Sequence, residues 1–167
     1  MPAAGSQTLL VDTNVIIEAV RTGCWPALTS HLRVETVDTC RDEARAGNPA
    51  RPGYVHVTAE HLARLHRVHP VTAVERASLV LAYDGADGMD DGERDLFAHA
   101  HARDDDTWVL CSPDKASVRA AVTLGWGDRL RSLGSLAALA GSRPRIPLKP
   151  HFEEAWLVTW RTHFRLA

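Results

Sequence analysis

The 167-residue sequence contains no apolar run near the roughly 20 residues that a membrane-spanning helix requires. Its first residues, MPAAGSQT, lack the basic start and the apolar centre of a secretory leader. These two absences predict a cytoplasmic protein with no membrane segment.

Cysteine is also scarce, and no familiar metal-binding motif is present. The three cysteines form neither a C-x-x-C pair nor a zinc-ligand spacing, and the nine histidines show no ligand spacing. We therefore expect reduced cysteines that pack in the core, and neither a disulfide scaffold nor a histidine metal site. The cysteines are Cys24, Cys40 and Cys111.

The sequence does contain enough apolar residues for one core. Apolar residues make up 45% of the chain and charged residues 24%, a balance typical of a globular protein. We expect one domain over residues 1–140. Residues 141–167 are expected to form a proline-containing linker and an amphipathic helix that packs on the domain or on a partner.

Charge is unevenly distributed, although the net charge is only -2. Residues 84–106 contain nine acids and two arginines, a net charge of -7, whereas residues 115–149 contain seven bases and one acid, a net charge of +6. Such neighbours are typical of a metal centre beside a surface that binds a polyanion. A solvated acidic loop and an ordinary basic helix are the alternative.

Strand and helix patterns alternate along the first part of the chain. Residues 8–12 form a short apolar run, and residues 14–21 follow with helical periodicity. Residues 33–39 alternate in the manner of a second strand, and residues 40–47 continue as a second helix. Because a strand–helix repeat is typical of a parallel sheet, the sequence predicts an α/β fold.

Polar signatures predict where later helices begin. Thr72 and Glu75 form a T-x-x-E capping box, and Thr58 is placed to cap an earlier helix. Ser112 and Pro113 are a favourable pair for the N-cap and first position of a later one. The further elements expected are an extended piece at 54–57, a strand at 108–111 and helices over 59–68, 73–83, 93–103 and 114–125.

Carboxylates fall near the ends of the predicted strands. Asp12 ends the first apolar run, Glu43 lies in the helix after the second strand, and Asp114 follows a later strand. Glu93 and Asp95 lie in the first turns of another helix. In a parallel α/β sheet, ligands bind beyond the carboxyl ends of the strands. The alternative for Asp12 is that it only caps the helix that follows.

Carboxylates gathered at one edge need a positive charge between them. Two like charges about 4 Å apart repel by about 4 kcal/mol at an effective dielectric constant of about 20. Mg²⁺ or Mn²⁺ suits this role because hard divalent cations take oxygen ligands. Two such ions about 3.5 to 4 Å apart are suited to phosphodiester hydrolysis, so the pattern favours a metal-dependent nuclease.

Four segments together resemble the PIN-domain family over roughly residues 8–140. They are LLVDTNVII, RDEARAG, DDGERDLFAHAHA and VLCSPDKASVRAAVTLGW, in this order. The resemblance implies a three-layer α/β/α sandwich with a short, mostly parallel sheet, and metal-dependent cleavage of RNA. Many small PIN proteins are toxins of the VapC type, restrained by an antitoxin. The expected partners are an RNA substrate, an antitoxin protein and a second copy of the chain.

The resemblance also assigns roles to individual residues. It implies that Asp12 is the first metal ligand, Glu43 the second and Asp114 the fourth. Asn14 matches a small polar residue that supports the first aspartate by hydrogen bonding. Asp42 is the competitor of Glu43, and Asp114 has the alternative of a helix-dipole interaction in the first turn of its helix.

The third acid of the family pattern falls on either Asp95 or Glu93. These two residues are two positions apart on a helix, about 200° around its axis, so we do not expect both to face one metal. If Asp90 caps this helix, Glu93 is its capping partner. We therefore prefer Asp95.

The C-terminal segment carries an aromatic residue at every fourth position, namely Phe152, Trp156, Trp160 and Phe164. We expect this stripe to pack on the core of its own domain. A dimer or antitoxin surface and a base-stacking surface are the alternatives. The bases that are candidates for contact with RNA phosphates are Lys115, Arg119, Arg129 and Arg131.

These observations lead to one principal hypothesis about function. We expect a ribonuclease dependent on Mg²⁺ or Mn²⁺ that needs no covalent intermediate on the enzyme. The alternative is a non-catalytic or weakly active PIN-like protein that binds RNA or regulates. A phosphatase with Asp12 as nucleophile is disfavoured, because VDTN lacks the second aspartate that such enzymes usually need for acid catalysis.

Overall fold

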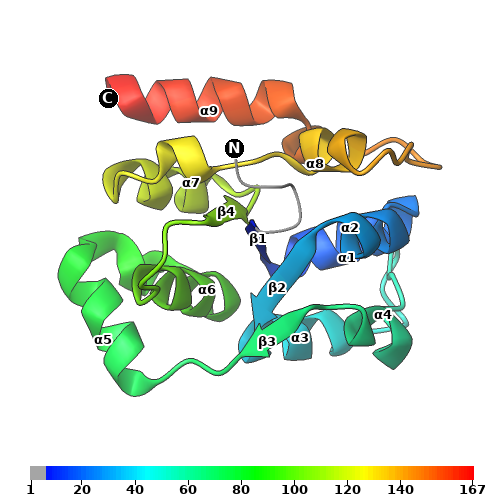
Figure 1. Cartoon of the computed structure of the whole chain (residues 1–167), viewed down its shortest axis with the longest axis horizontal. Helices are drawn as coiled ribbons and strands as arrows, with labels where there is room; N and C mark the ends of the chain where they lie inside the picture. The colour runs from blue at the N-terminus through cyan, green and yellow to red at the C-terminus, as the bar shows by residue number, and fades with distance from the viewer. Residues whose placement is uncertain (1–6) are drawn as a thin grey trace.

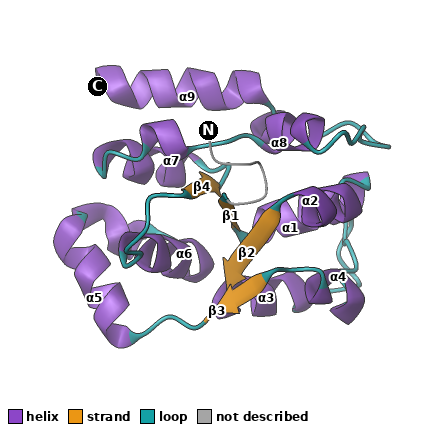
Figure 2. Cartoon of the chain, viewed as in Figure 1, coloured by secondary structure: helices purple, strands orange, loops and turns teal. Residues whose placement is uncertain are grey.

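The computed structural model describes residues 7–167, and the expectation about a leader falls mainly on residues outside this range. Four parallel strands form one sheet in the order β3–β2–β1–β4. Figure 2 shows helices on both sides of the sheet, which confirms the predicted α/β class. The strands are β1 (Thr8–Val11), β2 (Arg33–Val37), β3 (Arg67–His69) and β4 (Trp108–Cys111).

The helices alternate with these strands along the chain (Figure 1). The first helices are α1 (Thr13–Thr22), α2 (Trp25–His31), α3 (Asp38–Arg45) and α4 (Ala59–Ala63). The later ones are α5 (Ala73–Ala82), α6 (Asp91–His101), α7 (Lys115–Thr123), α8 (Leu133–Leu139) and α9 (Glu154–Leu166). Short 3₁₀ turns are η1 (Asp84–Gly88), η2 (Gly127–Arg129) and η3 (Pro150–Phe152). No helix among the described residues is long and apolar enough to cross a membrane.

Consecutive residues of β1 face two different cores, as the alternation of side chains along a strand requires. Leu9 and Val11 pack with apolar residues of α1, α2 and α8, whereas Leu10 packs with those of α6 and α7. The whole of β1 is buried. Helices therefore cover both faces of the sheet, which gives three layers.

The order of the strands creates a crevice beside β1. The chain passes outward from β1 through β2 to β3, and then returns to add β4 on the other side of β1. The connections that leave β1 and β4 thus diverge to opposite faces of the sheet. Asp12 follows β1 and Asp114 lies just beyond β4, so both stand at the switch point where ligands bind in such sheets.

One part of the sequence-based prediction fails at the edge of the sheet. The helix expected over residues 59–68 ends at Ala63, and the chain then forms β3. Residues 54–57, expected to be extended, lie outside the helices and strands. The His66 amide donates to the Val34 carbonyl at 2.8 Å, so pairing with β2 overrides the local helical pattern.

Of the capping predictions, two are confirmed and one is wrong. The box formed by Thr72 and Glu75 is present, and the hydroxyl of Thr58 caps α4. The prediction that Ser112 and Pro113 open α7 is wrong. Asp114 is the N-cap instead, and its carboxylate accepts a hydrogen bond from the Ala116 amide at 2.8 Å.

The C-terminal helix packs on the chain's own domain, as expected. Figure 1 shows α9 alongside α7, and its aromatic residues are half-buried against the core. The Lys115 ammonium lies 3.9 Å from the centre of the Trp160 ring, and the Arg119 guanidinium lies 5.0 Å from that of Phe164. Two bases considered for RNA contact therefore pair with the aromatic stripe.

Candidate active site

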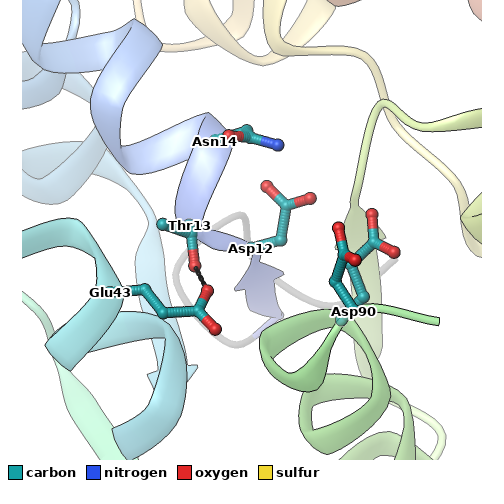
Figure 3. A pocket seen from close by; sticks show the side chains of 6 residues that line it. Asp12, Thr13, Asn14, Glu43 and Asp90 are labelled. Atoms are coloured by element: carbon teal, nitrogen blue, oxygen red, sulfur yellow. Dashed lines mark hydrogen bonds between the residues drawn. The ribbon is translucent and has the colours of Figure 1, made fainter. Parts of the chain in front are cut away.

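A pocket opens at the carboxyl edge of the sheet, between the first turns of α1 and α6 and the side of α3 (Figure 3). The cavity measures about 120 Å³. Since a water molecule takes about 30 Å³ in the liquid, this volume accommodates a small cation with several waters. The pocket is lined by Asp12, Thr13, Asn14, Glu43, Asp90 and Glu93.

Asp12 occupies the floor of this pocket and is 2% exposed. One carboxylate oxygen, Oδ1, accepts the Val15 amide at 2.9 Å, and the other, Oδ2, accepts the Ser112 hydroxyl at 2.9 Å. Burial raises the pKa of Asp12 to about 6, and these hydrogen bonds oppose the rise. Asp12 is therefore both the cap of α1 and a wall of the pocket, so the two roles expected for it do not exclude each other.

Two serines that the sequence did not single out for the site connect Asp12 to α6 and α7. The Ser112 hydroxyl, which bonds Asp12, lies 2.9 Å from the buried Ser117 hydroxyl. The Ser117 hydroxyl also lies close enough to Glu93 to oppose the rise in the pKa of that carboxyl. The sequence feature that could have identified Ser112 as a site residue is its position directly after β4, which matches the position of Asp12 after β1.

Glu93 reaches the pocket from the first turn of α6 and is 9% exposed. Its pKa is raised to about 8, first by burial and then by the negative charges of Asp114, Asp12 and Asp90. A cation among these groups would lower that pKa, because it would favour the charged carboxylate.

Asp95 does not line the pocket, although it was the preferred third acid. Its two oxygens accept the Arg76 guanidinium at 2.7 and 2.9 Å, and it also accepts the Thr39 hydroxyl. The hydrogen bond from Arg76 holds the pKa of Asp95 below its usual value. The carboxylates of Glu93 and Asp95 point apart because residues two positions apart on a helix diverge. The geometry therefore favours Glu93 for the third position.

Glu43 rather than Asp42 faces the pocket. The Thr13 hydroxyl donates to Glu43 Oε2 at 2.8 Å, a bond drawn in Figure 3. Asp42 instead accepts the Arg41 guanidinium at 2.9 Å outside the pocket. The choice of Glu43 from the sequence therefore agrees with the geometry.

Asp114 and Asn14 both lie near Asp12, as the sequence placed them. Asp114 is outside the lining of the pocket, yet its charge contributes to the raised pKa values of Asp12 and Glu93. Asn14 lines the pocket and is exposed. No side-chain hydrogen bond joins Asn14 to Asp12 among residues 7–167; Ser112 supports this carboxylate instead.

Asp90 was expected to cap α6 with its side chain. It occupies the N-cap position, but its carboxylate makes no capping hydrogen bond. Figure 3 shows this side chain turned to the pocket. Asp90 is thus a fourth acidic side chain that lines the cavity. In the sequence it was considered only as a helix cap, because aspartate is common at the N-cap position.

The donor set suits a hard divalent cation, although its geometry is not preformed. As arranged in residues 7–167, no group of three His, Cys, Asp or Glu side chains is in position to hold a metal ion. The pocket nevertheless offers carboxylate, hydroxyl and amide oxygens, which Mg²⁺ and Mn²⁺ prefer. Asp90 makes no capping bond, so its side chain can rotate toward an ion.

Comparisons of the chain with protein-family models, curated proteins and solved structures found no match.

Proposed function

We propose that the protein is a PIN-like ribonuclease that hydrolyses RNA phosphodiester bonds with Mg²⁺ or Mn²⁺. The observation that carries this proposal is the convergence of Asp12, Glu43, Asp90 and Glu93 on one pocket at the switch point of a parallel sheet. Carboxylates from three separate elements meet there, although capping and solvation would leave them scattered. The order of these acids along the chain is also the order in the PIN-like motifs.

Asp12, Glu43 and Glu93 would hold the metal, and Asp114 and Asp90 would add negative charge around it. The bound metal would supply Lewis acidity, which lowers the pKa of water and stabilises negative charge on a phosphate. The chain's own part is to hold the ligands. Ser112 and the Val15 amide fix Asp12, and Thr13 fixes Glu43.

A basic segment held along α1 supports a polyanionic substrate. Residues 143–151 contain two arginines, a lysine and a histidine, and no acid. The Lys149 amide donates to the Glu18 carboxylate at 2.8 Å, which anchors this segment on α1. Glu18 lies one helical turn after Asn14, which lines the pocket. Phosphates that flank a cleaved bond would meet these bases.

The deciding experiment is cleavage of a labelled single-stranded RNA in Mn²⁺, in Mg²⁺ and in EDTA. We expect cleavage that requires metal and falls by about 100-fold or more in Asp12→Asn. Asp42→Asn is the matched control, because this exposed acid lies outside the pocket. Equal cleavage by wild type and Asp12→Asn would refute the proposal.

A protein that binds RNA without cutting it is the second candidate. It is favoured by one observation, namely that no three ligands in residues 7–167 stand in position for a metal. Such a protein would bind labelled RNA equally well in Mn²⁺ and in EDTA, and would leave the RNA intact. Metal-dependent cleavage by the purified wild type would exclude it.

A toxin role restrained by an antitoxin, in a cytoplasmic homodimer, is the biology that the PIN resemblance implies. We include it in the proposal on that ground alone. Co-expression with the product of a neighbouring small gene tests it: an antitoxin would co-purify and suppress cleavage. Light scattering of the free protein tests the homodimer.

A further inference from the structure

Gly92, the second residue of α6, lies directly against α3. The Cys40 thiol of α3 lies 3.3 Å from the Gly92 carbonyl oxygen and donates to it. A Cβ atom added at Gly92 would stand 2.5 Å from Glu43 Oε2 and 3.2 Å from Cys40 Sγ. Side-chain carbon atoms do not approach other heavy atoms as closely as 2.5 Å, so any larger residue here would displace Glu43.

The backbone does not explain this glycine. The glycines with positive φ among residues 7–167 are Gly23, Gly53, Gly125 and Gly141, and Gly92 is not one of them. Gly92 therefore adopts a conformation open to any residue, inside a helix that alanine would favour. What the position requires is space for the Glu43 carboxylate.

Glu43 needs such support because it is exposed, and a long exposed side chain samples several rotamers. Two neighbours define its place in the pocket. On one side, the Thr13 hydroxyl donates a hydrogen bond to Oε2 at 2.8 Å. On the other side, the first turn of α6 has no side chain at Gly92 and so leaves space for the carboxylate. Loss of the hydroxyl, or a side chain added at Gly92, would turn the carboxylate to solvent.

We propose that Gly92 is a positioning residue that keeps the Glu43 carboxylate inside the acidic pocket. The inference rests on the proposed function, because metal binding is the property that this placement serves. Gly92 itself touches no ligand. It acts through Glu43, since its missing side chain leaves the volume that the carboxylate occupies.

The consequence for Gly92→Ala is a folded protein with a displaced glutamate. The closest atom to the added carbon is the end of a flexible side chain, which can rotate away without moving α3. The Cys40 sulfur needs to shift by only a few tenths of an ångström. We therefore expect a melting midpoint close to that of wild type.

The test measures Mn²⁺ binding by calorimetry and the Mn²⁺-induced shift of the melting midpoint, with the full-length chain. We expect Gly92→Ala and Glu43→Gln each to weaken Mn²⁺ binding by about 10- to 100-fold. The double variant should bind no more weakly than either single variant, because both changes remove the same ligand. Gly88→Ala is the matched control: its added Cβ meets nothing within 4 Å, and it should bind as wild type does.

A crystal structure of Gly92→Ala tests the inference without metal. If Glu43 Oε2 remains within hydrogen-bonding distance of Thr13 Oγ1, the inference is overturned. Wild-type Mn²⁺ binding in Gly92→Ala, or effects that add in the double variant, would overturn it as well. By contrast, wild-type protein that neither binds Mn²⁺ nor cleaves RNA would contradict the proposed function, and the crystal structure would still decide the role of Gly92.

A second variant covers the case in which Gly92→Ala does not fold. Glu43→Ala removes the side chain that the new methyl group would meet, so Gly92→Ala combined with Glu43→Ala should fold again. If the combined variant also fails to fold, the conflict lies with Cys40 rather than Glu43, and the inference is wrong.

Discussion

At the scale of single residues, the pocket concentrates negative charge that the fold alone does not need. Asp12 is buried with two hydrogen bonds, and Glu93 is buried among three other carboxylates. Burial and repulsion both disfavour the charged forms, which raises the pKa of Asp12 to about 6 and that of Glu93 to about 8. Such perturbed groups cluster at functional sites more often than elsewhere.

The raised pKa of Glu93 predicts a pH dependence of stability in EDTA. Folded Glu93 keeps its proton up to about pH 8, whereas the unfolded chain loses it near 4.5. The unfolded state therefore binds fewer protons, and the free energy of unfolding falls as the pH rises. His99, whose pKa is lowered to about 4, has the opposite effect below pH 6.5. Asp12, whose pKa is raised to about 6, acts in the same direction as Glu93 but mainly below pH 6.5. Glu93 therefore dominates over the other two groups in the window from pH 6.5 to 8.

We expect the melting midpoint of wild type in EDTA to fall by several degrees from pH 6.5 to 8. Glu93→Gln should remove most of this fall and be more stable than wild type at pH 8, because the amide carries no charge to bury. Added Mn²⁺ should stabilise wild type at pH 8. A midpoint that stays level or rises across this window in wild type would contradict the assignment.

At the scale of elements, Asp95 joins three helices through its side-chain contacts. From α6 it accepts Arg76 of α5 and Thr39 of α3. Since α3 carries Glu43 and α6 carries Glu93, this contact helps to fix two walls of the pocket relative to each other. The residue preferred from sequence as a ligand thus supports the site from outside.

We predict that Asp95→Asn lowers the free energy of unfolding by about 1 to 2 kcal/mol, less than for a fully buried pair because Arg76 is 41% exposed. Urea unfolding measures this decrease, and Mn²⁺ affinity should stay within about twofold of wild type. Asp91→Asn on the same helix breaks an exposed pair with Arg94 and should change stability by less than about 0.5 kcal/mol. A large fall in Mn²⁺ affinity in Asp95→Asn would restore Asp95 as a ligand.

The elements also show what the sequence could and could not predict. Buried strands such as β1 and β4 were predicted because their residues are apolar and flanked by clear breaks. The edge strand β3 was missed because Arg67 and His69 carry no strand pattern, and the strand forms through pairing with β2. Spacing could not decide between Glu93 and Asp95, since the side of α6 that meets the sheet edge depends on packing with other elements.

At the scale of the whole molecule, acidic and basic residues gather on different segments. The acids are concentrated on α6 and the loop before it, and bases without an intervening acid on the segment at 143–151. The Arg145 amide donates to the Thr22 carbonyl at 2.8 Å and the Lys149 amide to Glu18, so this segment is held along α1. The basic segment would attract the phosphates of a nucleic acid. The acidic pocket would repel them unless a cation were bound there.

We predict that the combined variant Arg143→Ala and Lys149→Ala weakens RNA binding, because in the proposed function each base would neutralise an RNA phosphate. In EDTA, the slope of log affinity against log salt should decrease by about 1 for each phosphate that is no longer neutralised. Fluorescence anisotropy with labelled single-stranded RNA at several salt concentrations measures this slope. Arg67→Ala on β3 is the control and should leave it unchanged. An unchanged slope in the combined variant would place the RNA path elsewhere.

The strand order has a final consequence for the protein during its synthesis. The walls of the pocket come from residues 12–14, 43 and 90–93, and its supporting serines from residues 112 and 117. Because β4 can insert beside β1 only after residues 108–111 have been made, a nascent chain that ends before them lacks a complete pocket. Whatever chemistry the pocket performs thus cannot begin before this strand has left the ribosome.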